Sequence, residues 1–230
     1  MSGAGGVSGV SGAAGKGAGT AGSTGGGDAA GSGSTGNCAT PPTGSALVGW
    51  AAQAGMGVTT TTGGGDAAPQ TVTTLAALTS AVSGTAAKVI YVTGFSNLIG
   101  AADNVAGDVG HLNVTWHHDW WADNVNQRMP RTRAGKVHLF NNLFTATGNS
   151  YCSNAGQGAA LLVENSIYNG VKAPFQVDSN SVGLVSKGNT FPGSTGTTTG
   201  SGTAFTPPYA CTPDDTTYLQ ASIQANAGPQ

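Results

Sequence analysis

Residues 114–144, VTWHHDWWADNVNQRMPRTRAGKVHLFNNLF, hold most of the large and reactive side chains of this chain. The stretch contains three of the four histidines, three of the four tryptophans and, within six positions, three of the eight basic residues. The rest of the chain is rich in Gly, Ala, Ser and Thr. Because functional sites need reactive groups close together, we expect this stretch to decide both the fold and the chemistry.

The same stretch contains two copies of a repeat that continues downstream. Four segments share the pattern: NVTWHHDWW, KVHLFNNLF, ALLVENSIY and GLVSKGNTF. Their last residues are aromatic and are spaced by 23, 24 and 23 positions: Trp121, Phe144, Tyr168 and Phe191. A small polar residue stands two positions before each aromatic: Asp119, Asn142, Ser166 and Asn189. An apolar residue stands seven positions before it: Val114, Val137, Leu161 and Leu184. A repeat of this length indicates a solenoid.

Each repeat holds one short β run and no helical stretch, so its unit is a coil of short strands. Stacked coils place aromatic over aromatic and let Asn side chains bond along a ladder. The sequence therefore predicts an all-β fold, a parallel β-helix with a short N-terminal helix and a loop-rich C-terminus. An antiparallel β-sandwich, the alternative, would show turn signals every 8–12 residues without this period.

The composition divides the chain at about residue 40. Residues 1–40 are low in complexity, Gly/Ser-rich and almost free of large apolar residues, so we interpret them as a flexible linker. Residues 41–230 form the predicted β-helix domain. Within it, residues 71–94 are expected to form a strand–helix–strand unit. The segment TTYLQASIQANAG predicts a terminal helix that could cap the open end of the stack.

The charge balance excludes several classes of partner. Only 8% of the residues are charged and the net charge is −2, which argues against nucleic acid or an anionic membrane surface. No apolar run reaches the roughly 18 residues of a membrane span. The composition is typical of an exported protein, although MSGAGGVSGV has no export signal, and we expect a secreted monomer. Three cysteines, Cys38, Cys152 and Cys211, allow at most one disulfide.

The tract QRMPRTR is the candidate for chemistry. Pro130 favours an extended backbone at Met129, and side chains alternate along a strand, so Arg131 and Arg133 should share one face. With Arg128 they form a cluster suited to a ligand that carries carboxylates. The alternative is a solvated basic loop paired with Asp119 or Asp123.

The sequence offers no strong metal site. His117 and His118 are adjacent on a strand, so we expect them to point to opposite faces and to serve in stacking rather than as ligands of one ion. Asp103 and Asp108 could offer oxygen to Ca²⁺, or could simply form a turn. Glu164 lies within a predicted strand and is expected to pair with a nearby polar group.

With these residues in view, the chain resembles the pectate lyases of polysaccharide lyase family 1. The stretch at residues 114–144, including R-x-P-x-x-R, resembles the family's most recognisable segment, and NLIGAAD, ALLVENSIY, GWAAQAG, VTTLAALTSAVSG, KVIYVTG and FTPPYACTPDD match further blocks. The resemblance implies a right-handed parallel β-helix. It also implies cleavage of polygalacturonate by β-elimination, with Arg128 as the base, Arg133 and Arg131 as substrate-binding residues, and calcium as cofactor.

The chain departs from this family between KVIYVTG and FSNLIG, where the family has several more coils. Those coils carry the calcium-binding aspartates, so no calcium ligand can be transferred to this chain, and Phe95 stands where the family has a lysine. We therefore expect an internal deletion after residue 94 and an altered junction at residues 93–107. Three functions remain open: a lyase (pectate- or pectin-cleaving), a non-catalytic β-helix that binds acidic polysaccharide, and a product without a selected function.

Overall fold

The structure is a computed structural model that describes residues 49–54, 67–84, 86, 88–92 and 97–226. The predicted linker at residues 1–40 lies outside the described residues, as does part of the predicted junction, at residues 93–96. The described β-strands are β1 (Pro69–Val72), β2 (Val89–Val92), β3 (Leu98–Ile99), β4 (Asn113–His117), β5 (Trp120–Trp121), β6 (Arg131–Thr132), β7 (Lys136–Phe140), β8 (Leu143–Phe144), β9 (Ser153–Ala155), β10 (Ala160–Glu164), β11 (Ile167–Tyr168), β12 (Phe175–Val177), β13 (Gly183–Lys187) and β14 (Ser201–Gly202). The described helices are the 3₁₀ turns η1 (Gly49–Ala52) and η2 (Ala106–Asp108) and the α-helices α1 (Leu75–Val82) and α2 (Leu219–Asn226).

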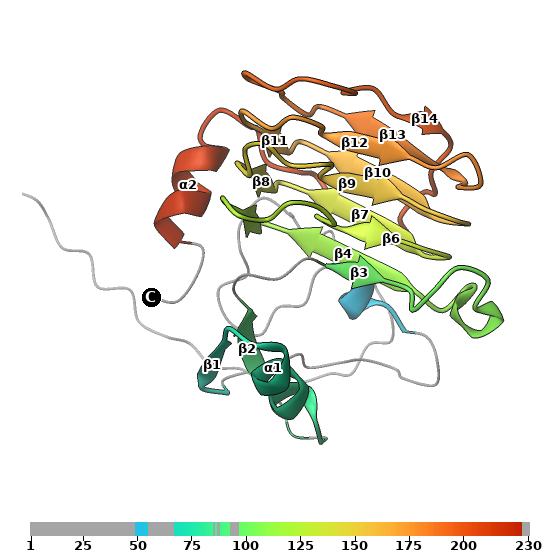
Figure 1. Cartoon of the computed structure of the whole chain (residues 1–230), viewed down its shortest axis with the longest axis vertical. Coiled ribbons are helices and arrows are strands. Elements are labelled where there is room, and N and C mark those ends of the chain that lie inside the picture. Colours follow the sequence, from blue (N-terminus) through green and yellow to red (C-terminus); the bar gives the residue numbers. More distant parts are fainter. Residues whose placement is uncertain (1–48, 55–66, 85, 87, 93–96, 227–230) are drawn as a thin grey trace, which may run out of the picture. The chain divides into compact units, whose positions relative to one another are not determined.

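The predicted parallel β-helix is confirmed. Its coils contribute strands to three sheets, in the orders β14-β13-β10-β7-β4, β11-β8-β5 and β12-β9-β6-β3. All of these pairings are parallel except that of β13 with β14. Figure 1 shows β4, β7, β10 and β13 side by side as successive coils. Val114, Val137, Leu161 and Leu184 share one register position, so the predicted apolar row is confirmed too.

The aromatic residues of the repeat form one continuous internal stack. The rings of Trp121 and Phe144 lie 4.8 Å apart and 4° from parallel. Those of Phe144 and Tyr168 lie 4.2 Å apart at 3°, and Tyr168 is followed by Phe191 at 5.4 Å. Stacks of this kind are worth more than their buried area alone, which explains why the repeat keeps an aromatic at this position.

The small polar residues form the predicted ladder, which we call the polar ladder (Asp119, Asn142, Ser166 and Asn189). The backbone N–H of each of the first three donates to the side chain of the next, at distances of 2.9, 3.1 and 2.8 Å. The Asn142 amide also donates to the carbonyl oxygen of Trp116, and that of Asn189 to the carbonyl oxygen of Val163. The ladder therefore satisfies buried backbone groups at the turns, where no strand can do so.

The predicted strand–helix–strand unit is present as β1, α1 and β2. The two strands pair in parallel, with Val72 opposite Val92. Thr74 caps α1 by accepting a hydrogen bond from the Ala77 N–H, as expected for a Thr before an apolar run. The helix ends at Val82, and Gly84 adopts a φ of 81° beyond it.

The C-terminal segment runs back along the outside of the coils. Tyr209 reaches Thr115 of β4 and His138 of β7 with its hydroxyl. Helix α2 buries Leu219 and Ile223 against Leu143 and Ile167. The expectation that this helix caps the open end of the stack is therefore wrong, because its apolar face packs on the outer side of β8 and β11.

None of the helices in the described ranges is both long and apolar enough to cross a membrane.

Candidate active site

The three arginines of QRMPRTR lie on and beside β6. Thr132, between two of them, is completely buried, so Arg131 and Arg133 share the outer face, as predicted for a strand. Their backbone N–H groups donate to the carbonyl oxygens of Asn97 and Ile99, at 3.0 and 2.9 Å. These bonds attach the tract to β3, the first strand of this sheet.

Arg131 is paired with Asp178, which follows β12 two coils further on. A guanidinium Nη lies 3.4 Å from Asp178 Oδ2. The other carboxylate oxygen, Oδ1, accepts hydrogen bonds from the amides of Asn154 and Gln176, both at 3.1 Å. Asp178 is thus held in place by its neighbours and has one oxygen left for Arg131.

Arg133 is paired with Asp103, which lies in the loop after β3. Its Nε is 2.5 Å from Asp103 Oδ1. The residues at the neighbouring coil positions are Gly100 and Gly156, and a Cβ at either would come within 2.8 Å of backbone oxygen. The alternative in which the arginines pair with Asp119 or Asp123 is wrong for Arg131 and Arg133, because coil stacking brings different carboxylates to them.

Arg128 differs from the other two arginines. Its backbone has a φ of 64°, in the left-handed region, where its carbonyl oxygen accepts a 2.7 Å hydrogen bond from the Asn97 N–H. The side-chain Nε is buried without a hydrogen-bond partner. Within the described part of the chain, no carboxylate is paired with this guanidinium. A residue held in such a backbone conformation is a candidate for function.

The carboxylates near the arginines do not fit a calcium cage. Ca²⁺ takes six to eight oxygen ligands, several of them from carboxylates. Asp103 is bound to Arg133, and Asp108 accepts a hydrogen bond from the Ala101 N–H. Among the described residues, no three His, Cys, Asp or Glu side chains gather closely enough to hold a metal ion. The possible calcium role of Asp103 and Asp108 therefore finds no support in this geometry.

The adjacent histidines do not point to opposite faces as expected. His118 adopts a φ of 60° after the end of β4, so its ring turns back and the two Nδ1 atoms lie 3.0 Å apart. His117 stacks on Phe140 with the planes 2° from parallel, which confirms the structural role. Burial, aided by the nearby charges of His118 and His138, lowers the pKa of His117 to about 4.

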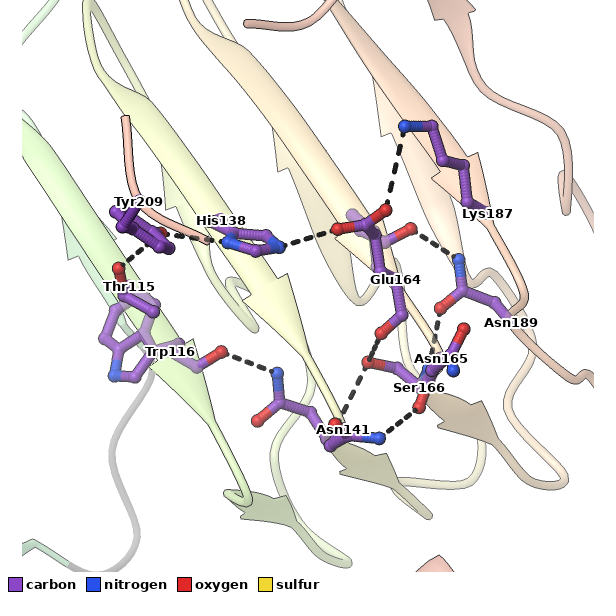
Figure 2. A network of polar contacts seen from close by, with 12 residues as sticks. Thr115, Trp116, His138, Asn141, Glu164, Asn165, Ser166, Lys187, Asn189 and Tyr209 are labelled. Carbon is purple, nitrogen blue, oxygen red and sulfur yellow. Dashed lines mark hydrogen bonds and ion pairs between the residues drawn. The ribbon is translucent and has the colours of Figure 1, made fainter. Parts of the chain in front are cut away.

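A second polar network lies on the sheet of β4, β7, β10 and β13 (Figure 2). His138 contacts the hydroxyl of Tyr209 through Nδ1 and the carboxylate of Glu164 through Nε2, both at 2.9 Å. Lys187 lies 3.7 Å from the other oxygen of Glu164. The hydrogen bond from His138 lowers the pKa of Glu164. The His138 side chain is only 1% exposed and uses both ring nitrogens, so it holds Tyr209 of the C-terminal segment in place and cannot itself reach a polymer.

Asn154, Gln176 and Asp178, which surround Arg131, were not predicted from the sequence. Arg131, Asn154 and Gln176 occupy equivalent positions of β6, β9 and β12, and Asp178 lies two residues beyond Gln176. The repeat positions that follow Arg131, spaced by 23 and then 22 residues, are Asn154 and Gln176, so the repeat extended across two coils leads to this group. An open hollow of about 550 Å³ elsewhere is lined by Asp123, Asn124, Val125, Asn126, Thr147 and Gly148, and by none of the arginines.

Comparison with known proteins places this geometry in context. Residues 95–230 match the family model described as pectate lyase. A pectate trisaccharide-lyase of Bacillus licheniformis is 34% identical over 137 residues, which are 58% of this chain and 38% of that protein. Pectate lyase B of Colletotrichum gloeosporioides is 34% identical over 134 residues, 57% of this chain and 40% of that protein.

A solved structure of a Bacillus subtilis pectate lyase variant is also similar. Its TM-score is 0.47 at 24% identity, and the alignment covers 57% of this chain and 36% of that one. This chain spans about two fifths of the length of the curated relatives that it matches.

Proposed function

The chain belongs to the pectate lyase family, and from that premise we propose that it cleaves polygalacturonate by β-elimination, with Arg128 as the base. In this proposal Arg133 and Arg131 bind the substrate. The observation that carries it is the contrast within one tract: Arg131 and Arg133 each hold an aspartate, whereas no carboxylate among the described residues is paired with Arg128.

That contrast matters because a guanidine can remove a proton only in its neutral form. A carboxylate beside a guanidinium holds the proton on it, while burial and neighbouring positive charge favour its loss. Arg131 and Arg133 lie within five positions of Arg128 in the same tract. Arg128 is thus the one arginine of the three without a carboxylate partner among the described residues.

The proposed reaction is an elimination across C4 and C5 of a galacturonate residue. Arg128 takes the proton at C5 of a galacturonate residue, and the electron pair of the broken C–H bond forms the C4–C5 double bond. The bond from C4 to the glycosidic oxygen then breaks, and that oxygen leaves with the bonding electrons and acquires a proton. The products are a new chain end and an unsaturated uronate.

Calcium is the cofactor that the family resemblance implies. Since Asp103 and Asp178 are each engaged by an arginine, we assign no calcium ligand among the described residues. Addition of Ca²⁺ belongs in the test for this reason.

We further propose that the protein works outside the cell as a monomer, with residues 1–40 as its linker. The support is compositional: few charges, a Gly/Ser-rich N-terminal segment and a disulfide-bonded Cys211, since disulfides persist in oxidising compartments.

The test is the ultraviolet absorbance of the unsaturated product, measured with the full chain and polygalacturonate, with and without added Ca²⁺. Wild type should generate the signal, and Arg128→Ala should lower the rate by about 10²-fold or more, the range expected for loss of a general base. Lys136→Ala, an exposed cation in the same stretch, is the matched control and should keep the wild-type rate.

Absence of product under both conditions contradicts the lyase proposal. If polygalacturonate then still binds, and binding is lost on substituting Arg128, Arg131 and Arg133 together, the protein is a polysaccharide-binding β-helix instead.

A further inference from the structure

We propose that Asp103 and Asp178 are specificity-determining residues that occupy the carboxylate-binding positions of Arg133 and Arg131, so that this face prefers esterified stretches of a polygalacturonate chain to fully ionised ones. The inference rests on the proposed function, because it concerns the substrate of the same site.

The two aspartates reach the arginines from opposite sides of β6. Asp103 comes from the loop after β3, on the N-terminal side, and Asp178 from the end of β12, two coils toward the C-terminus. Each places a carboxylate where an arginine would otherwise grip a ligand carboxylate. Both substrate-binding arginines are therefore already matched with acid from the protein itself.

Several hydrogen bonds hold Asp178 in its position beside Arg131. Asn154 and Gln176 hold its Oδ1, while its own carbonyl oxygen accepts hydrogen bonds from the N–H and the hydroxyl of Ser181, at 3.0 and 2.6 Å. Its carboxylate is thus fixed from two directions, and it keeps its place beside Arg131 when a ligand approaches.

Gly156 makes room for this arrangement. It occupies the coil position between Arg133 and Asp178, where a Cβ would lie 2.7 Å from the Thr132 carbonyl oxygen and 3.5 Å from Cγ of Arg133. Because Gly156 has no side chain, the arginine side chains and their aspartate partners can occupy the space above this coil.

The charges at this face nearly cancel. Three arginines contribute +3 and two aspartates −2, which leaves +1 over three stacked coils. Strands of neighbouring coils are about 4.8 Å apart, so a fully ionised polyuronate lying across them would bring several carboxylates beside two fixed ones. Like charges placed together cost binding free energy.

An esterified polymer avoids that repulsion and still finds partners. The side chains of Arg131 and Arg133 are partly exposed, at 23% and 15%, and guanidinium N–H groups can donate to neutral sugar hydroxyl and ester oxygens. The partly exposed ion pairs themselves are weak. The preference for the esterified polymer therefore comes from the fixed negative charges of Asp103 and Asp178, and not from the strength of their ion pairs.

The experiment measures binding to polygalacturonate and to highly methyl-esterified pectin, by affinity electrophoresis at low salt with the full chain. Arg128→Ala serves as the background, so that cleavage does not interfere. We expect the background protein to prefer the esterified polymer. Asp103→Asn together with Asp178→Asn should shift the affinity ratio toward polygalacturonate by about tenfold.

Two variants make the result specific. Asp123→Asn, an exposed residue of another loop, removes the same charge and should leave the ratio unchanged. Asp103→Glu keeps the charge and should keep the original preference, and circular dichroism checks the fold of each variant. A background protein that binds polygalacturonate as tightly as pectin overturns the inference, and so does an unchanged ratio in the double variant.

The inference and the proposed function fail separately. A shifted ratio, with no unsaturated product from either polygalacturonate or esterified pectin, supports the inference and contradicts the lyase proposal. Formation of unsaturated product, together with an unchanged affinity ratio in the double variant, supports the lyase proposal and contradicts the inference.

Discussion

Phe144 and Tyr168 stack with their ring centroids 4.2 Å apart and their planes 3° from parallel, although 24 positions separate them in the sequence. Both rings are completely buried. The period of one coil thus becomes a physical contact between neighbouring coils. The fold should be correspondingly sensitive to loss of one ring.

Phe144→Ala should lower the free energy of unfolding by about 3–5 kcal/mol, because it removes buried surface and leaves a cavity in the middle of the stack. Urea denaturation measures this change. Tyr218→Ala, which removes an aromatic ring that is 80% exposed, is the control and should stay within about 0.5 kcal/mol of wild type. A similar loss of unfolding free energy in the two variants would show that the aromatic stack does not stabilise the coils.

Glu164→Ala should cost about 1.5–3 kcal/mol at pH 7, since it removes the charged partner of buried His138. The His138 hydrogen bond lowers the pKa of Glu164, so the stabilisation is present above the ordinary carboxyl range and is lost as the pH falls through the folded-state pKa. Urea denaturation at pH 7 and below pH 4 measures the free energy of unfolding of both proteins. The difference between Glu164→Ala and wild type should be smaller at the acidic pH.

The control for this pair is Lys187→Met. Lys187 is 62% exposed and lies 3.7 Å from Glu164, so its loss should cost less than about 1 kcal/mol. A larger effect from Lys187 than from Glu164 would contradict the assignment of His138 as the main partner.

Asp119→Asn should stabilise the protein at alkaline pH. Burial raises the pKa of Asp119 to about 7, above the ordinary value of about 4. Its contribution to stability is fully present below about pH 4 and is lost as the pH rises through 7. Asparagine carries no such cost and already occupies the polar ladder at Asn142 and Asn189.

Thermal unfolding between pH 4 and pH 8 tests this prediction. The advantage of Asp119→Asn over wild type should widen across that range, whereas exposed Asp123→Asn should follow wild type. A constant or shrinking advantage would show that partial burial does not raise the pKa of the Asp119 carboxyl in the folded protein.

Arg128→Gly should be more stable than Arg128→Ala by about 1 kcal/mol, because residue 128 has a φ of 64° and a side chain in that region is strained. Both substitutions remove the guanidine, so any difference in urea denaturation reports the backbone alone. Equal stability, or a more stable alanine variant, would mean that the native backbone is not held there. The expected order would show that the backbone at residue 128 is strained in the native protein.

Much of the fold could be predicted because its information is local and periodic. Each coil meets the next at the same position, so the 23–24 residue spacing of Trp121, Phe144 and Tyr168 specifies the register directly. The same holds for the polar ladder and for the shared face of Arg131 and Arg133.

The acidic partners of the arginines were decided by the tertiary structure alone. Asp103 lies 30 positions before Arg133, and Asp178 lies 47 positions after Arg131. Neither distance is one repeat, since one partner is in a loop and the other is reached across an intervening coil. The positive φ of His118, which turns its ring toward His117, was likewise not evident from the sequence. The same is true of the packing of α2 against the side of the stack.

The sequence by itself determined the stacked coils and the cluster of arginines, because both follow from the alternation and spacing of neighbouring residues. Only the tertiary structure decided which charges those arginines meet. Ion pairs form between side chains that folding brings together across coils, and a one-dimensional period does not encode how far a side chain reaches.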